Sequence, residues 1–289
     1  MDCLNMCRPK TGRVKEITSL SNPIIKDLKA LSQKKNRNRE GLFMAEGLKL
    51  VIDALDLGWT IQTLIFSKSK IGNAAIENTA ARAVANGGFV IKASQKVMES
   101  LTRRDNPQTV IGIFKQKWHP FEMIKGQIKD VYIALDRVRD PGNLGTIIRT
   151  ADAVGAKGVI LIGETTDPFS TETVRATMGS IFSVPLYRLD ESAFLNWSAH
   201  FKGMIVGTHL KGSLDYRTLD FKNGPIILLM GNEKQGLSDL LTNRCDKLAR
   251  IPQSGRADSL NLAVATAVML YEIRRPYLIL EPCEEKYDA

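Results

Sequence analysis

The stretch Asp136–Leu161, DRVRDPGNLGTIIRTADAVGAKGVIL, combines a turn, a helix and the start of a strand, and it decides the fold of the second half of the chain. Pro141, Gly142 and Asn143 form the turn, and we expect Asn143 to cap the helix that follows, because a side-chain oxygen there can accept from a free backbone N–H. Helical spacing predicts an apolar stripe that packs on a sheet, made of Leu144, Ile147, Ile148, Ala151 and Val154.

Arg149 falls on the other side of this helix. The residues around it on that side are small: Gly145, Thr146, Ala153 and Ala156. A face of small residues lets a ligand or another backbone come close. A lone exposed charge in water fits the helix equally well, so the helix by itself leaves both interpretations open.

Strands rich in Val, Ile and Leu alternate with helices throughout the chain. After residue 129 the longer elements predict an α/β domain with a mainly parallel sheet covered on both faces, and ligands in such sheets bind beyond the carboxyl ends of the strands. Shorter elements before it, beginning with a helix after Asn22-Pro23, predict a small α/β unit. We therefore expect domains at 1–117 and 129–289, joined by a linker at 118–128.

Charge is divided unevenly between the two parts. Residues 1–120 contain 20 Lys and Arg against 10 Asp and Glu, whereas 121–289 contain 20 against 21. A basic first part favours a polyanionic partner, with a merely solvated basic surface as the alternative. The densest basic cluster is Lys34, Lys35, Arg37 and Arg39, which is the best candidate to contact such a polyanion.

Several classes of protein are disfavoured. No apolar run approaches the roughly 18 residues that a membrane span requires, and the N-terminal residues lack the pattern of a secretory signal, so a cytoplasmic protein is expected. The four cysteines form no Cys-x-x-Cys pair and the three histidines share no helical face, which argues against a metal site. The glycine fingerprint of ordinary dinucleotide-binding folds is missing, and this disfavours the doubly wound nucleotide-binding enzymes.

Two further loops carry polar residues at predicted strand ends. MGNEKQGLS, 230–238, places Glu233 directly after an apolar strand. IPQSGRADSLN, 251–261, places Ser259 and Asn261 before a helix so apolar that we expect it to be buried on every side, in a core or a subunit interface. Burial of Asn261 would be costly unless a ligand or a backbone group pairs with it.

Taken in order, these loops resemble the motifs of the SpoU (TrmH) family of RNA ribose 2′-O-methyltransferases, in the SPOUT superfamily. The matching stretches are PGNLGTIIRTADAVGA, MGNEKQGLS and IPQSGRADSLNLAVATAVMLYE, with a weaker match in VRATMGSIFSVPLY. Residues 16–117 are similar to the family's N-terminal substrate-binding domain, which is like a ribosomal protein in fold. The sequence departs from many members at Lys234-Gln235, where they have a glycine after the glutamate.

The resemblance implies a deep trefoil knot, a homodimer and S-adenosylmethionine as cofactor. It also implies two sets of site residues. The catalytic set is Asn143, Arg149, Glu233, Ser259 and Asn261. The cofactor-binding set is Thr208, Gly231, Ile251 and Leu260.

The implied substrate is RNA, and the two-domain layout favours ribosomal RNA over transfer RNA. With such a substrate, we predict that Lys34, Lys35, Arg37 and Arg39 bind RNA phosphates. A non-catalytic RNA-binding protein of the same fold is the alternative from another class. It would be expected to lack one or more of the catalytic set, all of which are present.

Overall fold

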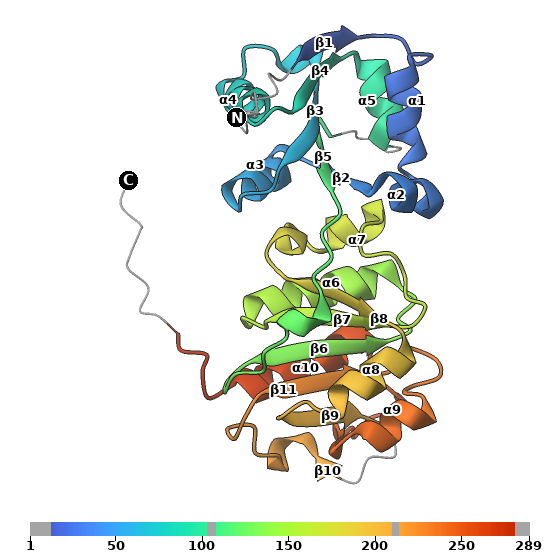
Figure 1. The fold of residues 1–289 in the computed structure, drawn as a ribbon, viewed down its shortest axis with the longest axis vertical. Helices are drawn as coiled ribbons and strands as arrows, with labels where there is room; N and C mark the ends of the chain where they lie inside the picture. Colours follow the sequence, from blue (N-terminus) through green and yellow to red (C-terminus); the bar gives the residue numbers. More distant parts are fainter. Residues whose placement is uncertain (1–12, 103–107, 210–213, 281–289) are drawn as a thin grey trace, which may run out of the picture. The chain divides into compact units, whose positions relative to one another are not determined.

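The computed structural model describes residues 13–102, 108–209 and 214–280. The chain forms two compact units, shown in Figure 1. The N-terminal unit contains the described residues up to Trp118 together with Asp167–Ser183, and the C-terminal unit contains His119–Thr166 and the residues from Val184 onward. These units are defined by packing alone, and Asp167–Ser183 packs with the N-terminal unit although it lies far along the chain. The domain limits expected from the sequence therefore stay a prediction.

A mixed five-stranded sheet forms the centre of the N-terminal unit, in the order β1-β4-β3-β5-β2. Its strands are β1 (Val14–Ile17), β2 (Leu42–Glu46), β3 (Ile61–Ser67), β4 (Phe89–Ala93) and β5 (Val110–Lys115). The first three strands of that order run parallel, and β5 is antiparallel to both of its neighbours. Helices α1 (Pro23–Ala30) and α5 (Gln95–Thr102) cover one face, and α3 (Leu48–Asp56) and α4 (Ala74–Ala85) cover the other (Figure 1).

The segment Asp167–Ser183 completes this unit from far along the chain. It forms α7 (Thr171–Ala176) and the short helix η3 (Ser180–Phe182). The Trp59 Nε1–H donates to the carbonyl of Phe182 at 2.9 Å, and the Phe43 ring packs on Phe169 with ring centres 5.0 Å apart. The Arg175 guanidinium also pairs with the buried Glu46 carboxylate at 2.7 Å. Hydrophobic, aromatic and ionic contacts thus hold the segment in place.

Seven parallel strands form the sheet of the C-terminal unit, in the order β10-β12-β9-β11-β6-β7-β8. They are β6 (Val131–Asp136), β7 (Gly158–Ile162), β8 (Leu186–Leu189), β9 (Met204–Thr208), β10 (Leu214–Asp215), β11 (Ile226–Met230) and β12 (Lys247–Arg250). Helices α6 (Pro141–Ala153) and α10 (Leu262–Arg274) pack together on one face, and α8 (Glu191–Ser198) and α9 (Asp239–Arg244) lie on the other. The parallel sheet covered on both faces is confirmed.

Helix α6 begins earlier than the sequence analysis expected. Asp140 is its N-cap and accepts from the Asn143 N–H at 2.6 Å, with Pro141 in the first turn. The prediction that Asn143 is the cap is therefore wrong, and Asn143 is a helical residue whose side chain is available for other contacts. The apolar stripe from Leu144 to Val154 is confirmed, since each of its members is at most 1 % exposed.

One further expectation about a helix face is wrong, and a second stays open. Gly145, expected beside Arg149 on the outer side, is buried. The side chains of Val264 and Tyr271 on helix α10 are 51 % and 53 % exposed in the single chain, so the expected burial of this helix in a core or a subunit interface stays a prediction. Along the described parts of the chain, no helix combines the length and apolar character needed to cross a membrane.

Candidate active site

The loops singled out in the sequence leave neighbouring strands at one edge of the parallel sheet. Strand β11 lies between β9 and β6, and β12 lies on the other side of β9. Parallel strands have their carboxyl ends at the same edge, so the loops after β6, β11 and β12 emerge close together. This carboxyl edge is where the polar residues meet.

The loop after β11 is closed by its own backbone. Asn232 and Gly236 exchange two hydrogen bonds, of 3.0 and 2.9 Å, and the Asn232 Oδ1 accepts from the N–H groups of Lys234 and Gln235. An added Cβ at Gly231 would stand 2.3 Å from the backbone of Gly236, so only glycine fits there. Lys234-Gln235, the departure from the family pattern, therefore occupies the tip of a tight turn.

Glu233 reaches from this turn to the start of α6. Its carboxylate accepts from the backbone N–H groups of Arg139 and Asp140 at 3.2 and 3.1 Å. It also accepts from the Asn143 Nδ2 at 3.3 Å. A negative charge is favourable beside a helix N-terminus, where the backbone N–H groups have no helical partner.

Asn143 passes the connection on to the third loop. Its Oδ1 accepts from the Asn261 Nδ2 at 2.9 Å. The Asn261 Oδ1 in turn caps α10 by accepting from the N–H groups of Ala263 and Val264 at 2.9 and 3.3 Å. A chain of hydrogen bonds therefore runs from Glu233 through Asn143 to Asn261 and ties the three loops together.

Arg149 and Ser259 stand outside this chain. Arg149 is exposed on α6, and within the described ranges its guanidinium has neither a hydrogen bond nor an ion pair. Ser259 lies in a run from Pro252 to Asn261 in which every residue is exposed. Of the catalytic set, the structure brings together Asn143, Glu233 and Asn261, and it leaves Arg149 and Ser259 facing outward.

The predicted cofactor residues gather at the same edge. Thr208 ends β9, and its hydroxyl lies 3.3 Å from the sulfur of Met230 at the end of β11, directly before Gly231. Ile251 follows β12, and the Leu260 side chain is 37 % exposed. Among described residues, no hydrogen-bond partner holds the backbone of 252–260. These apolar side chains and available backbone groups suit an adenosine, and the described residues include no cluster of metal ligands.

Asp136 holds two of these loops together and was not singled out from the sequence. It ends β6, is 2 % exposed, and its carboxylate accepts from the Ser238 N–H at 3.1 Å and from the Arg137 guanidinium at 2.7 and 2.9 Å. Hydrogen bonding to this carboxylate raises the pKa of Arg137. Asp136 thus holds the β6 and β11 loops in register, and an acidic residue closing an apolar strand is the signal that could have revealed it.

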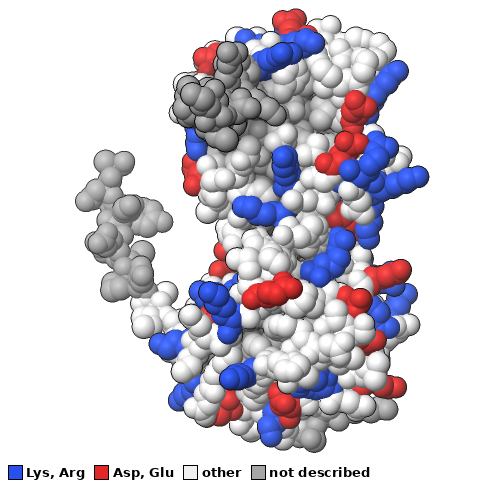
Figure 2. All heavy atoms as spheres, in the orientation of Figure 1, with Lys and Arg blue, Asp and Glu red and all other residues white. Residues whose placement is uncertain are grey.

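The basic cluster in the N-terminal unit lies on α2 (Lys34–Glu40), where positive side chains gather with acidic ones among them (Figure 2). Lys34, Lys35 and Arg39 are exposed. Arg37 is only 4 % exposed and faces into the unit, so its prediction as an RNA-binding residue is corrected. The cause is an acidic partner far along the chain that pairs with it.

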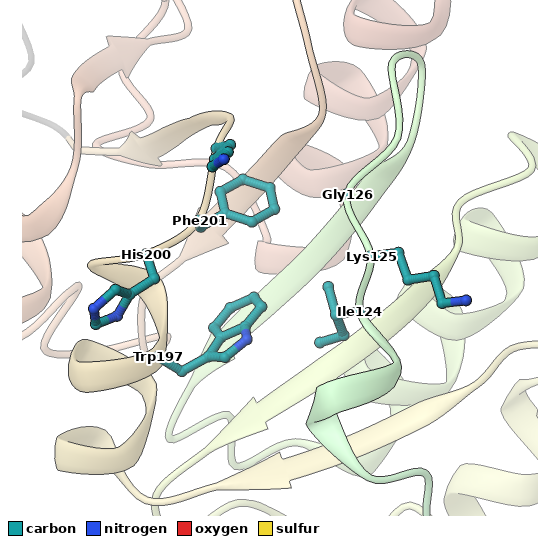
Figure 3. A pocket seen from close by; sticks show the side chains of 7 residues that line it. Ile124, Lys125, Gly126, Trp197, His200 and Phe201 are labelled. Atoms are coloured by element: carbon teal, nitrogen blue, oxygen red, sulfur yellow. The ribbon is translucent and has the colours of Figure 1, made fainter.

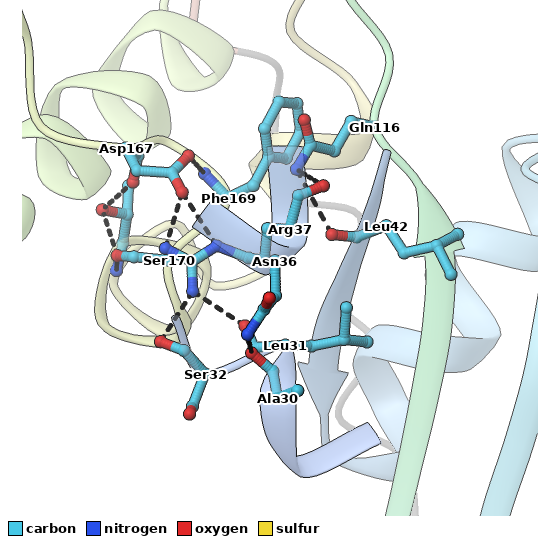
Figure 4. A network of polar contacts seen from close by, with 11 residues as sticks. Ala30, Leu31, Ser32, Asn36, Arg37, Leu42, Gln116, Asp167, Phe169 and Ser170 are labelled. Carbon is cyan, nitrogen blue, oxygen red and sulfur yellow. Dashed lines mark hydrogen bonds and ion pairs between the residues drawn. The ribbon is translucent and has the colours of Figure 1, made fainter. Parts of the chain in front are cut away.

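Figure 4 shows the network that holds Arg37. Its Nη2 and Nε lie 2.6 and 2.8 Å from the Asp167 Oδ2, and its Nη1 donates to the carbonyls of Leu31 and Ser32. The other Asp167 oxygen accepts from the Phe169 N–H at 2.9 Å. The buried guanidinium therefore has partners on both sides, as a charge taken out of water requires.

Comparison with known proteins gives the class first. Residues 130–271 match the model of the SpoU rRNA Methylase family, and residues 22–112 match an MRM3-like substrate binding domain. The chain is 30% identical, over 92% of its own length and 94% of the relative's, to a 23S rRNA (uridine(2479)-2'-O)-methyltransferase of Streptomyces viridochromogenes. It is 30% identical, over 90% of itself and all of the relative, to the 23S rRNA (guanosine(2553)-2'-O)-methyltransferase RlmP of Bacillus subtilis.

Solved structures agree. An AdoMet-bound rRNA methyltransferase from Sinorhizobium meliloti is 58% identical, superposes with a TM-score of 0.87, and matches 92% of this chain and 99% of its own. The chain belongs to the SpoU (TrmH) family of RNA methyltransferases, as the motif resemblance predicted.

Proposed function

We infer that this chain transfers a methyl group from S-adenosylmethionine to the 2′-oxygen of a ribose in ribosomal RNA. The observation that carries the inference is the hydrogen-bonded chain from Glu233 through Asn143 to Asn261, in a member of this family. Two relatives that share nearly the full length are named as 23S rRNA 2′-O-methyltransferases. Those two relatives act on different nucleotides, a uridine and a guanosine, so the target base is left to experiment.

S-Adenosylmethionine is the cofactor, because the highly similar S. meliloti enzyme and the S. viridochromogenes methyltransferase AviRb have both been solved with AdoMet bound. When bound, it supplies an electrophilic methyl group on sulfur. We propose that Ile251 and Leu260 enclose the adenine, that the backbone near Gly231 and along 252–260 binds its polar atoms, and that Thr208 lines the pocket. The exposed, unpartnered backbone of 252–260 supports this assignment.

Arg149 is proposed as the residue that acts on the 2′-oxygen. A guanidinium carries N–H donors and no acceptor atom, so the Arg149 side chain serves better as a donor to the developing alkoxide or to the adjacent phosphate than as a base. The proton would leave to phosphate or water. Its exposure and lack of a protein partner among described residues leave the guanidinium available for that contact.

Asn143, Glu233, Ser259 and Asn261 are proposed to position the ribose. Glu233 fixes the Asn143 amide, and Asn143 fixes that of Asn261, so neither amide rotates freely. Ser259 precedes Asn261 by two residues in the exposed run and would reach the ribose from that side. Groups held before the substrate arrives lower the entropic cost of aligning it for in-line attack.

A homodimer and a knotted C-terminal unit are further parts of the proposal. Val264 and Tyr271 expose apolar surface on α10, which packs beside α6 and its exposed Arg149, and a second copy would cover that surface. After β11 the chain crosses β9 to form β12 on its far side, and it then returns to place α10 against α6. This path supports the knot. Sedimentation equilibrium tests the dimer, and a crystallographic trace of 226–274 tests the knot.

The exposed α2 residues Lys34, Lys35 and Arg39 are proposed to contact RNA phosphates. Replacing all three with glutamine should weaken RNA binding and flatten its dependence on salt. Each phosphate contact that is lost reduces the number of counterions released on binding, and that number sets the salt slope. An unchanged salt slope would mean that these charges are only a solvated surface.

The decisive experiment is incubation with labelled S-adenosylmethionine and unmodified total RNA, followed by mapping of the methylated ribose. Label on a 2′-oxygen of ribosomal RNA is expected. Label on transfer RNA would show that transfer RNA, and not ribosomal RNA, is the substrate. Tight RNA binding without any methylation would favour a non-catalytic RNA-binding protein.

A further inference from the structure

A pocket of about 320 Å³ lies in the C-terminal unit, away from the loops described so far. Aromatic side chains of Trp197 and Phe201 line it, together with Ile124 and the backbone of Gly126. In Figure 3 the two rings and the Ile124 side chain face a common space, whereas the side chains of His200 and Lys125 point outward on either side. We call it the amino-edge pocket.

The position of the pocket separates it from the proposed active site. Ile124 and Gly126 precede β6, and Phe201 and Lys202 precede β9, so the pocket opens at the amino ends of these strands. Glu233, Asn143 and Asn261 meet at the carboxyl ends of the same sheet. The two sites therefore lie at opposite edges, and the amino-edge pocket is not part of the cofactor site.

The shape of the pocket suits a flat ring. The ring centres of Trp197 and Phe201 are 5.7 Å apart with their planes inclined at 40°, so the two rings touch and together offer one aromatic surface on which a flat ring can lie. A Cβ added at Gly126, whose φ is +60°, would come within 3.0 Å of the Phe201 ring. Glycine thus lets the backbone approach the aromatic ring, and the cavity volume is at the lower end of the range of about 300 to 1,000 Å³ for small-ligand sites.

The rim of the pocket is basic. Lys125, His200 and Lys202 are exposed lining residues, and none of the described residues that line the cavity carries a carboxylate. The nearby Asp130 is 9 % exposed and its carboxylate accepts from the Gln127 N–H at 2.9 Å, so it is turned into the structure. Aromatic walls that accept a base and cations that meet its phosphates are the combination found in single-stranded nucleic-acid sites.

We propose that the amino-edge pocket binds an unpaired nucleotide of the substrate RNA, with the base against Trp197 and Phe201 and the flanking phosphates beside Lys125 and Lys202. This inference rests on the proposed function. It adds a second anchor on the RNA, at the opposite edge of the sheet from the methylated ribose, and so predicts a dependence on an unpaired base outside the target nucleotide.

Charge reversal at the rim tests the proposal in the full-length enzyme. Lys125→Glu with Lys202→Glu should raise KM for ribosomal RNA about tenfold or more and reduce the salt slope of binding by about 1.4, the value for two single-strand phosphate contacts. The kcat at saturating RNA and the Kd for S-adenosylmethionine should stay the same. If the wild type methylates the RNA and the double variant has the same KM, the pocket does not bind RNA, and the proposed function is unaffected.

Lys157→Glu with Lys247→Glu is the matched control. These exposed lysines stand at the amino ends of β7 and β12 and do not line the pocket, yet the net charge changes equally. Their KM should stay close to that of the wild type. An equal rise in KM in both double variants would mean that general attraction, and not the pocket, holds the RNA.

Substitution of the aromatic wall tests base stacking. Trp197→Ala should raise KM for RNA about tenfold, whereas Trp197→Phe should recover most of it, because any aromatic ring offers a stacking face. Photocrosslinking with RNA that carries 4-thiouridine should label the peptide containing Trp197 and Phe201. Absence of crosslinked RNA on that peptide, while the same RNA becomes methylated, would contradict the proposal. So would a pocket that binds a free nucleotide but whose substitution leaves the KM for RNA unchanged.

Discussion

Helices α2 and α6 each present an arginine that the sequence marks as functional, and the two arginines have opposite environments. Arg37 of α2 comes from the densest basic cluster, yet it is buried between Asp167 and the carbonyls of Leu31 and Ser32. Arg149 of α6 lies among apolar residues in the sequence, yet it is on the opposite side of the helix from them and is exposed. Charge density along the sequence indicates where a helix has cations, but burial determines whether a cation can meet a ligand.

The largest expected effect is on catalysis at Arg149. Arg149→Ala should lower kcat/KM for RNA by a factor of about 10³, the upper range for loss of one preorganised donor, with calorimetric binding of S-adenosylmethionine near normal. Asp152→Ala, another exposed position on α6, is the control and should retain activity. Full activity in Arg149→Ala would remove the arginine from the mechanism.

Arg37 should show the reverse pattern, a loss of stability. Arg37→Ala leaves Asp167 buried without its cation and should reduce the free energy of unfolding by about 3 to 5 kcal/mol, measured by urea denaturation. Arg39→Ala removes an exposed pair with Glu40 and should cost at most about 1 kcal/mol. Equal losses in the two variants would refute the distinction between a buried and an exposed arginine on one helix.

Asn261 allows helix capping to be separated from the active-site network. Asn261→Asp keeps an oxygen to cap α10 but cannot donate to the Asn143 Oδ1, so stability should change by less than about 0.5 kcal/mol while kcat/KM falls about tenfold. Asn261→Ala loses both contacts and should also lower stability by about 1 kcal/mol. Retained kcat/KM in the aspartate variant would show that the Asn143 contact is dispensable.

The smallest effect concerns the partly buried thiol of Cys245. Burial raises the pKa of Cys245 from 9.0 to about 12, so the folded protein keeps a proton that the unfolded chain releases above pH 9. Stability from this group is therefore complete below pH 9 and declines as pH rises from 9 to 12. Cys245→Ala should flatten that part of the stability–pH curve, and peptide mapping after alkylation at pH 8 should find Cys245 unmodified in the folded wild type.

Elements with a regular apolar pattern could be read from the sequence. Strand β6 coincides with the run VYIALD, because both faces of a covered parallel sheet demand apolar residues. Strand β1 (VKEI) was not predicted, since only Ile17 of it is buried, and α2 has no apolar spacing because its buried member is an arginine. Such elements depend on partners elsewhere in the chain, which local pattern does not contain.

The candidate site divides in the same way. The edge rule and the motif resemblance predicted that the three loops would meet, but the atoms that join them depend on a helix start that was misplaced. Pro141 in the first turn was a usable signal, because proline is favoured just after a cap and indicates Asp140. The inward turn of Arg37 had no local signal, since Asp167 lies 130 residues further along.

Packing of Asp167–Ser183 into the N-terminal unit has a consequence for biosynthesis. The Glu46 carboxylate, the Trp59 indole and the Arg37 guanidinium all take partners from that segment. A ribosome must therefore synthesise the chain past residue 183 before the N-terminal unit can complete its folding. Until then these side chains lack the partners that the segment supplies. Protease digestion of stalled nascent chains should show protection of the N-terminal unit only in chains that expose this segment.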